Sequence, residues 1–340
     1  MELTPLLLPV AGWSWVARAY VVGPVAERYP LSESVEVIRP QDVGGGAGEA
    51  PGITPLRRAF RLELSHRVCH NPRMKFDLVA GTTALYLDPV YYDYEYRGRL
   101  SDVRFYTDHY LRHADAAAPV LELGVGSGRI ALKAVRKGAN VLGLDLSTDM
   151  LDRCEEGRLK LPKASRDRLR LVQGDMRAFN FEQRFPLISC PFNAFMHLYT
   201  NEDAERCLTQ IRRHLGPGGL FLLDVLMPDL DYLNRPAFKT FAGVRFKHPR
   251  YDCHFTYAEQ TAYDAVTQLN QIKLLYDRTD PLESGPPSYV VELSHRYFFP
   301  AELLALLHGN GFQVLHRFGD FEGGSLDAQC ESQVLVCGLA

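Results

Sequence analysis

The feature that most restricts the fold of this chain is a glycine-rich turn between a short apolar segment and a helix-like segment. The apolar segment covers residues 120–123, glycines occupy positions 124, 126 and 128, and a helical pattern begins at Arg129. Glycine permits a left-handed backbone and a close approach to a ligand, and the first turn of a helix presents free N–H groups. A buried strand, a tight turn and a helix in this order predict a ligand-binding turn at the edge of a sheet.

Strand-like and helix-like segments alternate around this turn. Apolar runs predict buried strands over residues 119–123, 140–144, 169–172, 187–190 and 220–226, and near the end of the chain over 312–316 and 333–337. Helical patterns cover residues 102–113, 129–137, 203–215 and 300–308. Such alternation is typical of a parallel sheet with helices on both faces. We therefore predict an α/β fold with a doubly wound, mostly parallel, seven-stranded sheet.

Two parts of the chain do not follow the alternation. Residues 1–82 carry short period-two patterns, for example at 62–68 and 74–78, which predict a β-rich N-terminal extension of unknown role. Residues 238–298 contain several strand-like runs without a long helix between them, which predicts an antiparallel insertion in a domain over 83–340. Short strands bury little surface alone, so we expect the extension to pack on the insertion or on a second subunit.

Composition and charge exclude several classes of protein. The 340 residues are 46% hydrophobic and 23% charged, with a net charge of −3, which gives no electrostatic footprint for nucleic acid. The short N-terminal apolar run is interrupted by Pro5 and Pro9, so we expect neither a signal peptide nor a membrane helix. An odd number of cysteines, seven, indicates reduced thiols and a cytoplasmic location. The His and Cys residues within 66–70 and 248–254 fit no standard zinc spacing, so we expect no metal.

Three further motifs follow the glycine turn in a fixed order. Asp145 ends the second strand about twenty residues after the glycines, where a carboxylate can accept both hydroxyls of a ribose. Asp175 and Met176 follow the third strand, and residues 214–224 lead through a Gly-Pro-Gly-Gly turn into the fifth. Taken alone, Asp145 could be a helix cap and Asp175 a turn residue, but four motifs at strand ends favour one cofactor site.

Together these motifs resemble those of class I methyltransferases that depend on S-adenosylmethionine (SAM), in particular the small-molecule enzymes that include amino-sugar N-methyltransferases. A dinucleotide fingerprint would need a glycine where Arg129 stands. The resemblance covers about residues 88–340 and implies a Rossmann-like methyltransferase fold with SAM as cofactor. It also implies cofactor-binding roles for Arg99, Glu122, Gly124, Gly126, Gly128, Asp145, Leu146, Met150, Asp175, Met176 and Cys190. In that scheme Glu122 would face the methionine amino group and Asp175 the amino group of adenine.

The loop after the fourth strand, residues 190–199, is expected to line the methyl-transfer site. It carries a His-Leu pair at 197–198, as in the small-molecule enzymes, and lacks the Asn/Asp-Pro-Pro-Tyr/Phe motif of base-methylating enzymes. Tyr92 and Tyr96 lie in a segment that resembles the helix covering SAM. We name His197, Tyr92 and Tyr96 as catalytic candidates, with His197 orienting the acceptor or taking its proton. The alternatives are a structural loop histidine and an interfacial aromatic cluster.

We therefore expect methyl transfer from SAM to a nitrogen or oxygen of a small-molecule acceptor, such as a secondary metabolite or sugar. The insertion would roof the acceptor pocket or form the interface of a homodimer. Two alternatives stay open at this point. One is methylation of a protein or peptide side chain that residues 1–82 recognise, and the other is a SAM-binding partner subunit without turnover.

Asp145 offers a direct test of the cofactor assignment. Asp145→Ala should weaken SAM binding by about 1.5–3 kcal/mol, because charge-assisted hydrogen bonds to the ribose are lost. Titration calorimetry with SAM and with NAD measures this, and the wild-type chain should bind SAM and ignore NAD. An unchanged SAM affinity in the variant would remove Asp145 from the site.

Overall fold

The computed structural model of the chain describes residues 78–114, 118–281 and 285–340. Its larger sheet has seven strands in the order β10-β11-β5-β4-β1-β2-β3. They are β1 (Val120–Leu123), β2 (Val141–Asp145), β3 (Leu169–Gln173), β4 (Phe185–Cys190), β5 (Leu215–Leu226), β10 (Phe312–Phe318) and β11 (Ser332–Leu339). Strands β5, β4, β1, β2 and β3 run parallel, whereas β11 and β10 pair antiparallel at the end of the sheet. The predicted mostly parallel, seven-stranded α/β sheet is confirmed.

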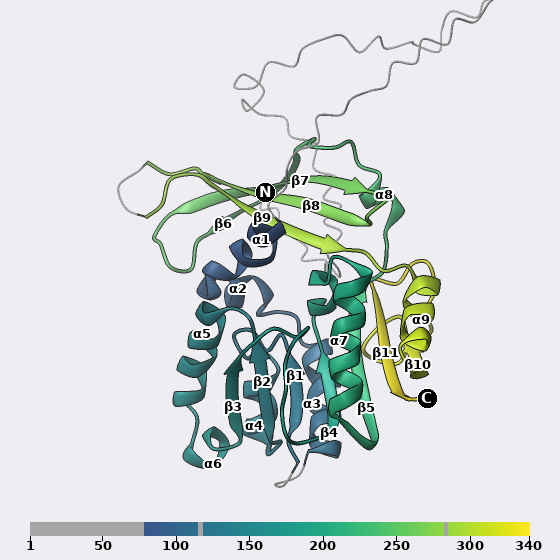
Figure 1. Cartoon of the computed structure of the whole chain (residues 1–340). Coiled ribbons are helices and arrows are strands. Elements are labelled where there is room, and N and C mark those ends of the chain that lie inside the picture. The colour runs from purple at the N-terminus through teal and green to yellow at the C-terminus, as the bar shows by residue number, and fades with distance from the viewer. Residues whose placement is uncertain (1–77, 115–117, 282–284) are drawn as a thin grey trace, which may run out of the picture. The chain divides into compact units, whose positions relative to one another are not determined.

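Helices cover both faces of this sheet (Figure 1). They are α3 (Ser101–His113), α4 (Ala131–Lys137), α5 (Thr148–Leu159), α6 (Lys163–Arg166), α7 (Asn201–His214) and α9 (Pro300–Gly309). Helices α3, α4 and α5 contribute to one apolar cluster, and α7 and α9 contribute to another with the opposite side chains of the same strands. The central strands β1, β2 and β4 are buried on both faces, which explains why they are nearly continuous apolar runs in the sequence.

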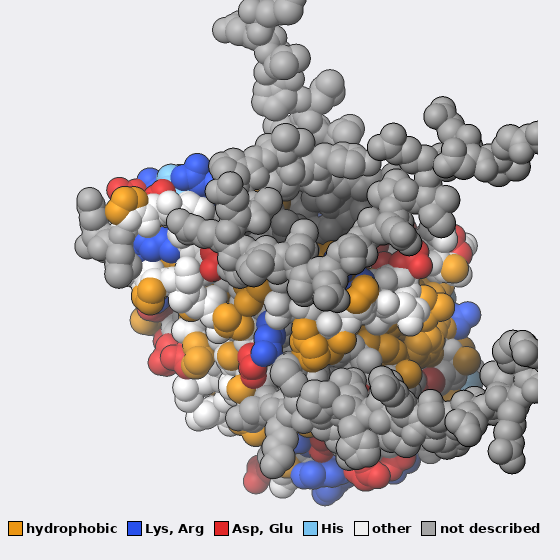
Figure 2. Space-filling model, turned by 90° about the horizontal axis from the view of Figure 1, so that it is seen from above, with side chains coloured by type: hydrophobic (Ala, Val, Ile, Leu, Met, Phe, Trp, Pro, Cys, Tyr) orange, Lys and Arg blue, Asp and Glu red, His pale blue; other side chains and the backbone are white. Residues whose placement is uncertain are grey.

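A second, antiparallel sheet has the order β6-β7-β8-β9 and lies above the carboxyl ends of the parallel strands (Figure 1). It consists of β6 (Phe241–Lys247), β7 (His254–Asp264), β8 (Leu269–Arg278) and β9 (Tyr289–Arg296), and the short helix α8 (Leu230–Leu233) precedes it. We call these four strands the roof sheet. They confirm the predicted antiparallel insertion. Figure 2 looks down on the molecule from this side, where hydrophobic side chains are exposed between charged ones.

Three short helices precede α3 in the chain. They are α1 (Leu78–Thr83), η2 (Ala84–Leu87) and α2 (Pro89–Tyr96). The start of α2 follows from its sequence, because Asp88 accepts a hydrogen bond from the backbone N–H of Tyr91 and Pro89 occupies the first turn. Helix α1 lies against β9, where a Cβ on Gly81 would come within 2.3 Å of the Ser294 hydroxyl.

The predicted N-terminal extension is described only at its end. Leu78, expected in a strand, begins α1, and the boundary placed between residues 82 and 83 falls inside this helix. The other strands predicted for residues 1–82 lie outside the described residues. Within the described ranges, no helix is long and apolar enough to cross a bilayer.

Phe298 joins the roof sheet to the larger sheet and is fully buried. Its ring lies 5.2 Å from that of Phe195, and its backbone oxygen accepts a hydrogen bond from the buried Gln333 side chain at 2.8 Å. Phe298→Ala should lower the free energy of unfolding by about 3–5 kcal/mol, because a large cavity opens in the core. Urea denaturation measures the loss, with Val266→Ala as control, since Val266 is 93% exposed. Equal effects of the two substitutions would contradict this packing.

Candidate active site

A cavity of about 590 Å³ lies at the carboxyl ends of β1, β2, β3 and β4, which is within the usual range of about 300–1,000 Å³ for small-molecule sites. We call it the cofactor cavity. Helices α1 and η2 and Tyr92 of α2 form one side. The other sides are the glycine turn, the segments that follow β2 and β3, and the loop after β4. Of the residues predicted from the sequence, the cavity is lined by Tyr92, Gly124, Gly126, Asp145, Leu146, Met150, Asp175, Met176 and His197.

The three glycines of the turn have positive φ angles, of +72° at Gly124, +56° at Gly126 and +82° at Gly128. Side chains would strain the backbone at all three positions. Gly126 lines the cavity, and a Cβ there would lie 3.2 Å from the Met150 side chain. Gly128 lies against the adjacent helix, because a Cβ there would come within 2.5 Å of the Cys154 sulfur, and its predicted contact with the cofactor stays a prediction. The turn therefore leaves room for a ligand at Gly126 and for an adjacent helix at Gly128.

Asp145 connects the glycine turn to the end of β2. Its Oδ2 accepts a hydrogen bond from the Gly126 N–H at 2.7 Å, and its Oδ1 accepts one from the Ser147 N–H at 2.9 Å. Burial raises the pKa of this carboxyl, and the backbone N–H groups of Ser147, Gly126 and Leu146 partly oppose that shift. An ionised carboxylate has about four acceptor positions, so Asp145 can still accept the hydroxyls of a ribose.

Asp175, predicted at the adenine end, is held by an arginine that the sequence analysis did not single out. The Arg177 guanidinium donates to both carboxylate oxygens of Asp175, at 2.7–3.0 Å, and to Asp203 at 3.0 Å. Burial acts to raise the pKa of Asp175, but the hydrogen bonds from Arg177 outweigh it and the pKa lies below its usual value. The pair forms an ordered wall at this end of the cavity.

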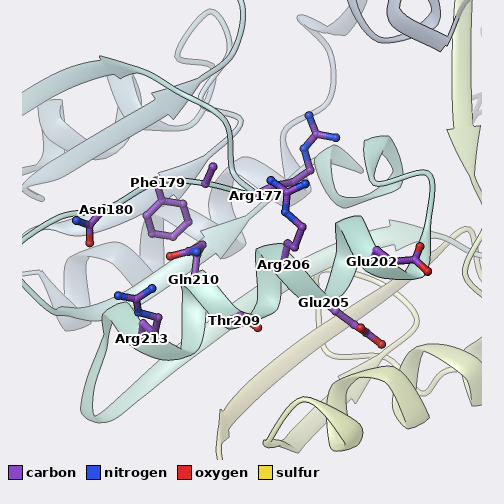
Figure 3. A pocket seen from close by; sticks show the side chains of 10 residues that line it. Arg177, Phe179, Asn180, Glu202, Glu205, Arg206, Thr209, Gln210 and Arg213 are labelled. Atoms are coloured by element: carbon purple, nitrogen blue, oxygen red, sulfur yellow. The ribbon is translucent and has the colours of Figure 1, made fainter.

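Arg177 also lines a separate surface hollow of about 660 Å³ beside α7 (Figure 3). Arg206, Gln210 and Arg213 reach into it from α7, and Phe179 lies across from them on the segment after β3. Because Arg177 lines both spaces, its ion pair with Asp175 separates this hollow from the cofactor cavity.

Glu122 and Cys190 lie behind the cavity wall. Glu122 is 1% exposed and accepts a hydrogen bond from the Tyr110 hydroxyl at 3.0 Å, and burial raises its pKa to about 8. Cys190 is fully buried in the core, which raises the pKa of its thiol. Neither residue is among the described side chains that line the cavity. Their predicted contacts with the cofactor stay predictions.

Tyr92, Tyr96 and Arg99 differ in their positions. Tyr92 lines the cavity, whereas Tyr96 is buried between Tyr92 and Phe192, with ring centroids at 4.7 and 5.0 Å. Arg99 uses its backbone oxygen to accept a hydrogen bond from Arg129 at 3.1 Å, and it does not line the described cavity. The structure thus brings only Tyr92 of these three to the described cavity wall, and the predicted roles of Tyr96 and Arg99 stay predictions.

The loop after β4 has an uncommon backbone conformation that a buried carboxylate stabilises. Phe192 and Asn193 have φ angles of +56° and +63°, and their N–H groups donate to Asp224 of β5 at 2.8 and 3.2 Å. Tyr106 of α3 donates its hydroxyl to the same carboxylate at 2.6 Å. Burial raises the pKa of Asp224 to about 6. Asp224 therefore positions the loop that carries His197, a role that the sequence analysis did not assign.

His197 lies at the wall of the cavity in a polar cluster. Its Nε2 is 2.7 Å from the Tyr86 hydroxyl, and its Nδ1 is 3.4 Å from the Tyr199 hydroxyl. Tyr199 in turn contacts the Thr82 hydroxyl at 2.8 Å. Burial lowers the pKa of His197 to about 4, so the imidazole is neutral at pH 7. No sequence motif marks Tyr86, Tyr199 or Thr82, and the structure adds all three to the site.

Known proteins share this domain. The model of the methyltransferase domain matches residues 120–219. The glycine/sarcosine N-methyltransferase of Halorhodospira halochloris is 30% identical over 216 residues, which are 62% of this chain and 72% of that protein. This chain belongs to the SAM-dependent methyltransferases. The positive φ at Gly126 and the free acceptor positions of Asp145 fit that cofactor.

Other relatives match this methyltransferase over different lengths of the chain. The cypemycin N-terminal methyltransferase of a Streptomyces species is 35% identical over 109 residues, which are 32% of this chain and only 42% of that protein. Two dTDP-amino-sugar N,N-dimethyltransferases, of Streptomyces venezuelae and Streptomyces fradiae, also match. The solved structure of the CcbJ methyltransferase from Streptomyces caelestis superposes with a TM-score of 0.60 at 27% identity, covering 72% of this chain and 98% of that one.

The lowered pKa of His197 makes stability depend on pH. A histidine whose pKa falls from 6.5 to about 4 on folding contributes stability above pH 6.5 that is lost as the pH falls towards 4. His197→Gln should therefore remove about 2 kcal/mol of the stability difference between pH 7 and pH 5. Urea denaturation at the two pH values measures this.

His308→Gln is the matched control, because His308 is exposed at the end of α9. It should keep the pH dependence of the wild-type methyltransferase. A His197→Gln variant with the full wild-type pH dependence would show that His197 is protonated as readily in the folded as in the unfolded chain.

Proposed function

We propose that this methyltransferase methylates the nitrogen of a small-molecule amine. The observation that carries the proposal is the position of His197 at the cavity wall, half-buried and with its Nε2 2.7 Å from the Tyr86 hydroxyl. Desolvation there lowers the pKa of the imidazole to about 4 and keeps it neutral. A hydroxyl acceptor needs a base whose pKa lies near the working pH, and this histidine is too weak a base for that task. An amine acceptor needs only to be neutral and well oriented.

In this reaction the residues of the cofactor cavity would bind SAM and orient the acceptor. Asp145 and the backbone at Gly126 would hold SAM, which supplies an electrophilic methyl group on a sulfonium. Tyr86, Tyr92 and His197 would orient the acceptor on the side opposite the ribose-binding carboxylate. Helices α1 and η2 cover one side of the cavity, and alignment in a site shielded from water supplies much of the rate enhancement for an in-line displacement.

Three named relatives support nitrogen as the methylated atom. The glycine/sarcosine enzyme is an N-methyltransferase, the dTDP-amino-sugar enzyme is an N,N-dimethyltransferase, and the cypemycin enzyme is an N-terminal methyltransferase. These acceptors differ in size but each presents an amine. The shared chemistry therefore supports an amine for this chain, and the acceptor itself is a question for experiment.

An acceptor panel tests this function. The purified chain is incubated with SAM and with glycine, sarcosine, a dTDP-amino sugar, a short peptide with a free N-terminus, and hydroxylated counterparts of each. We expect methyl gain, by mass spectrometry, on an amine, with one S-adenosylhomocysteine formed for each methyl group transferred. Methylation of the hydroxylated counterparts alone would contradict the proposal.

Tyr86→Phe and His197→Gln test the orienting pair. Each should lower kcat by up to about 100-fold with little change in SAM affinity, because a misplaced acceptor reacts slowly. Tyr94→Phe is the matched control, since Tyr94 lies on α2 outside the described cavity wall and should leave the rate unchanged. Wild-type kcat in both variants would make the pair structural, and a loss near 10⁴-fold would instead favour general-base chemistry on a hydroxyl.

A further inference from the structure

A second cavity, of about 580 Å³, lies over the end of β5 and under the roof sheet. The segment 226–232 forms one wall, residues 328–331 form another, and Ile272, His295 and Tyr297 form the inner surface. Among the described residues, none lines both this space and the cofactor cavity. Nothing in the roles assigned so far uses this second cavity.

His295 of β9 lines the second cavity and lies beside a residue of the cofactor cavity wall. Its ring centroid lies 5.2 Å from that of His197, which lines the cofactor cavity. We call these two residues the histidine pair. The pair spans the wall between the two cavities.

The His295 side chain is buried and has no hydrogen-bond partner among the side chains and backbone groups that the structure describes. It is 7% exposed, and within the described part of the chain no hydrogen bond reaches either of its ring nitrogens. Burial, and then the neighbouring His197, lower its pKa well below the usual value, so the ring offers one N–H donor and one lone pair. Buried polar groups are nearly always hydrogen-bonded to protein or to water, so an imidazole that faces a cavity without a partner among the described residues is free to bind a polar group of a ligand there.

The charged residues that line the second cavity, among those described, are all acidic. Asp229, Asp231 and Glu331 line its exposed part, and no lysine or arginine is among its described lining residues. Asp229 already caps α8 by accepting from the N–H groups of Asp231 and Tyr232. Asp231 and Glu331 are exposed carboxylates at the rim, and they favour a cation. The inner surface, with Ile272, Tyr297 and the neutral His295, disfavours a charge.

We propose that the second cavity is the entrance of the acceptor site, that it admits a small amine in its ammonium form, and that His295 positions the neutral amine beside His197 at the wall of the cofactor cavity. This inference rests on the proposed N-methylation and names the place and charge of its acceptor. The rim carboxylates attract the ammonium ion, which releases one proton to water before it reaches the low-dielectric interior. His295 then forms a hydrogen bond with the neutral amine at the wall between the cavities.

The transfer step balances without a further reactant. The amine lone pair forms a bond to the methyl carbon, and the carbon–sulfur bond breaks with its electron pair going to sulfur. The N-methylammonium product then loses a proton to water. His295 is thus a positioning residue, and no proton has to be stored on its imidazole.

Binding of methylammonium, a minimal cationic amine, tests the pocket without any turnover. The protein is prepared with ¹⁵N-labelled histidine, and the His295 ring resonances are assigned by their absence in His295→Gln. We expect a saturable shift of the His295 signals with methylammonium and none with the neutral analogue methanol. An absent or non-saturable His295 shift with methylammonium, or an equal shift with methanol, would overturn the pocket.

Rim variants test the charge selection. Asp231→Asn combined with Glu331→Gln should weaken methylammonium binding about tenfold. Glu322→Gln is the matched control, because Glu322 is exposed nearby but outside the described lining of the cavity. The control should keep the wild-type affinity. Equal affinity in the rim variant and the control would remove the carboxylates from the proposal.

Kinetics separate this proposal from the proposed function. With an amine that the acceptor panel identifies, His295→Leu should raise the acceptor KM about three- to tenfold without changing SAM affinity, and His295→Gln should restore part of the loss. Methylation with wild-type KM in His295→Leu and in the rim variant would overturn the pocket while N-methylation stands. Specific methylammonium binding without methylation of any amine would overturn N-methylation while the pocket stands.

Discussion

The carboxylate of Asp145 makes the contact on which the rest of the site depends. It accepts N–H groups from the glycine turn after β1 and from the loop after β2, so one side chain sets the relative position of both loops. These loops lie close together because β1 and β2 are parallel neighbours in register, with Leu123 opposite Leu144. The turn itself needs glycines at positive φ, and such a backbone keeps its shape only where neighbouring groups hold it. The cofactor cavity, and the starts of α4 and α5 beside it, follow from this contact.

A second buried carboxylate organises the reacting end in a similar way. Asp224 of β5 receives two backbone N–H groups from the loop after β4 and one hydroxyl from Tyr106 of α3. The two residues with positive φ in that loop are thereby fixed against the central sheet. His197 and Tyr86 then meet on a rigid support rather than on a free loop. A site that aligns an amine with a methyl group gains its rate from such support more than from acid–base chemistry.

Burial decides the electrostatic character of the two cavities. In the cofactor cavity it keeps His197 neutral, while Asp145 and Asp175 are held by hydrogen bonds from neighbouring N–H groups. In the second cavity the carboxylates stand at the rim and the uncharged side chains lie inside. A cation can be drawn to such a rim but is disfavoured beyond it, so an ammonium ion would arrive charged and react neutral. The roof sheet contributes Ile272 and His295 to the uncharged inner surface of the second cavity.

The amino-acid sequence by itself determined the class of fold and the cofactor. Buried strands, helical periods and a glycine turn are local patterns, and the place of Asp145 at a strand end follows from the strand alone. The partners of His197 depended on the tertiary structure, because Tyr86 is 111 residues away along the chain and Asp224 is 118 residues from Tyr106. The same holds for His295, which meets His197 only because the roof sheet folds back over β4. Burial sets the charge state of both histidines, and burial is a property of the packed molecule that no local stretch of sequence contains.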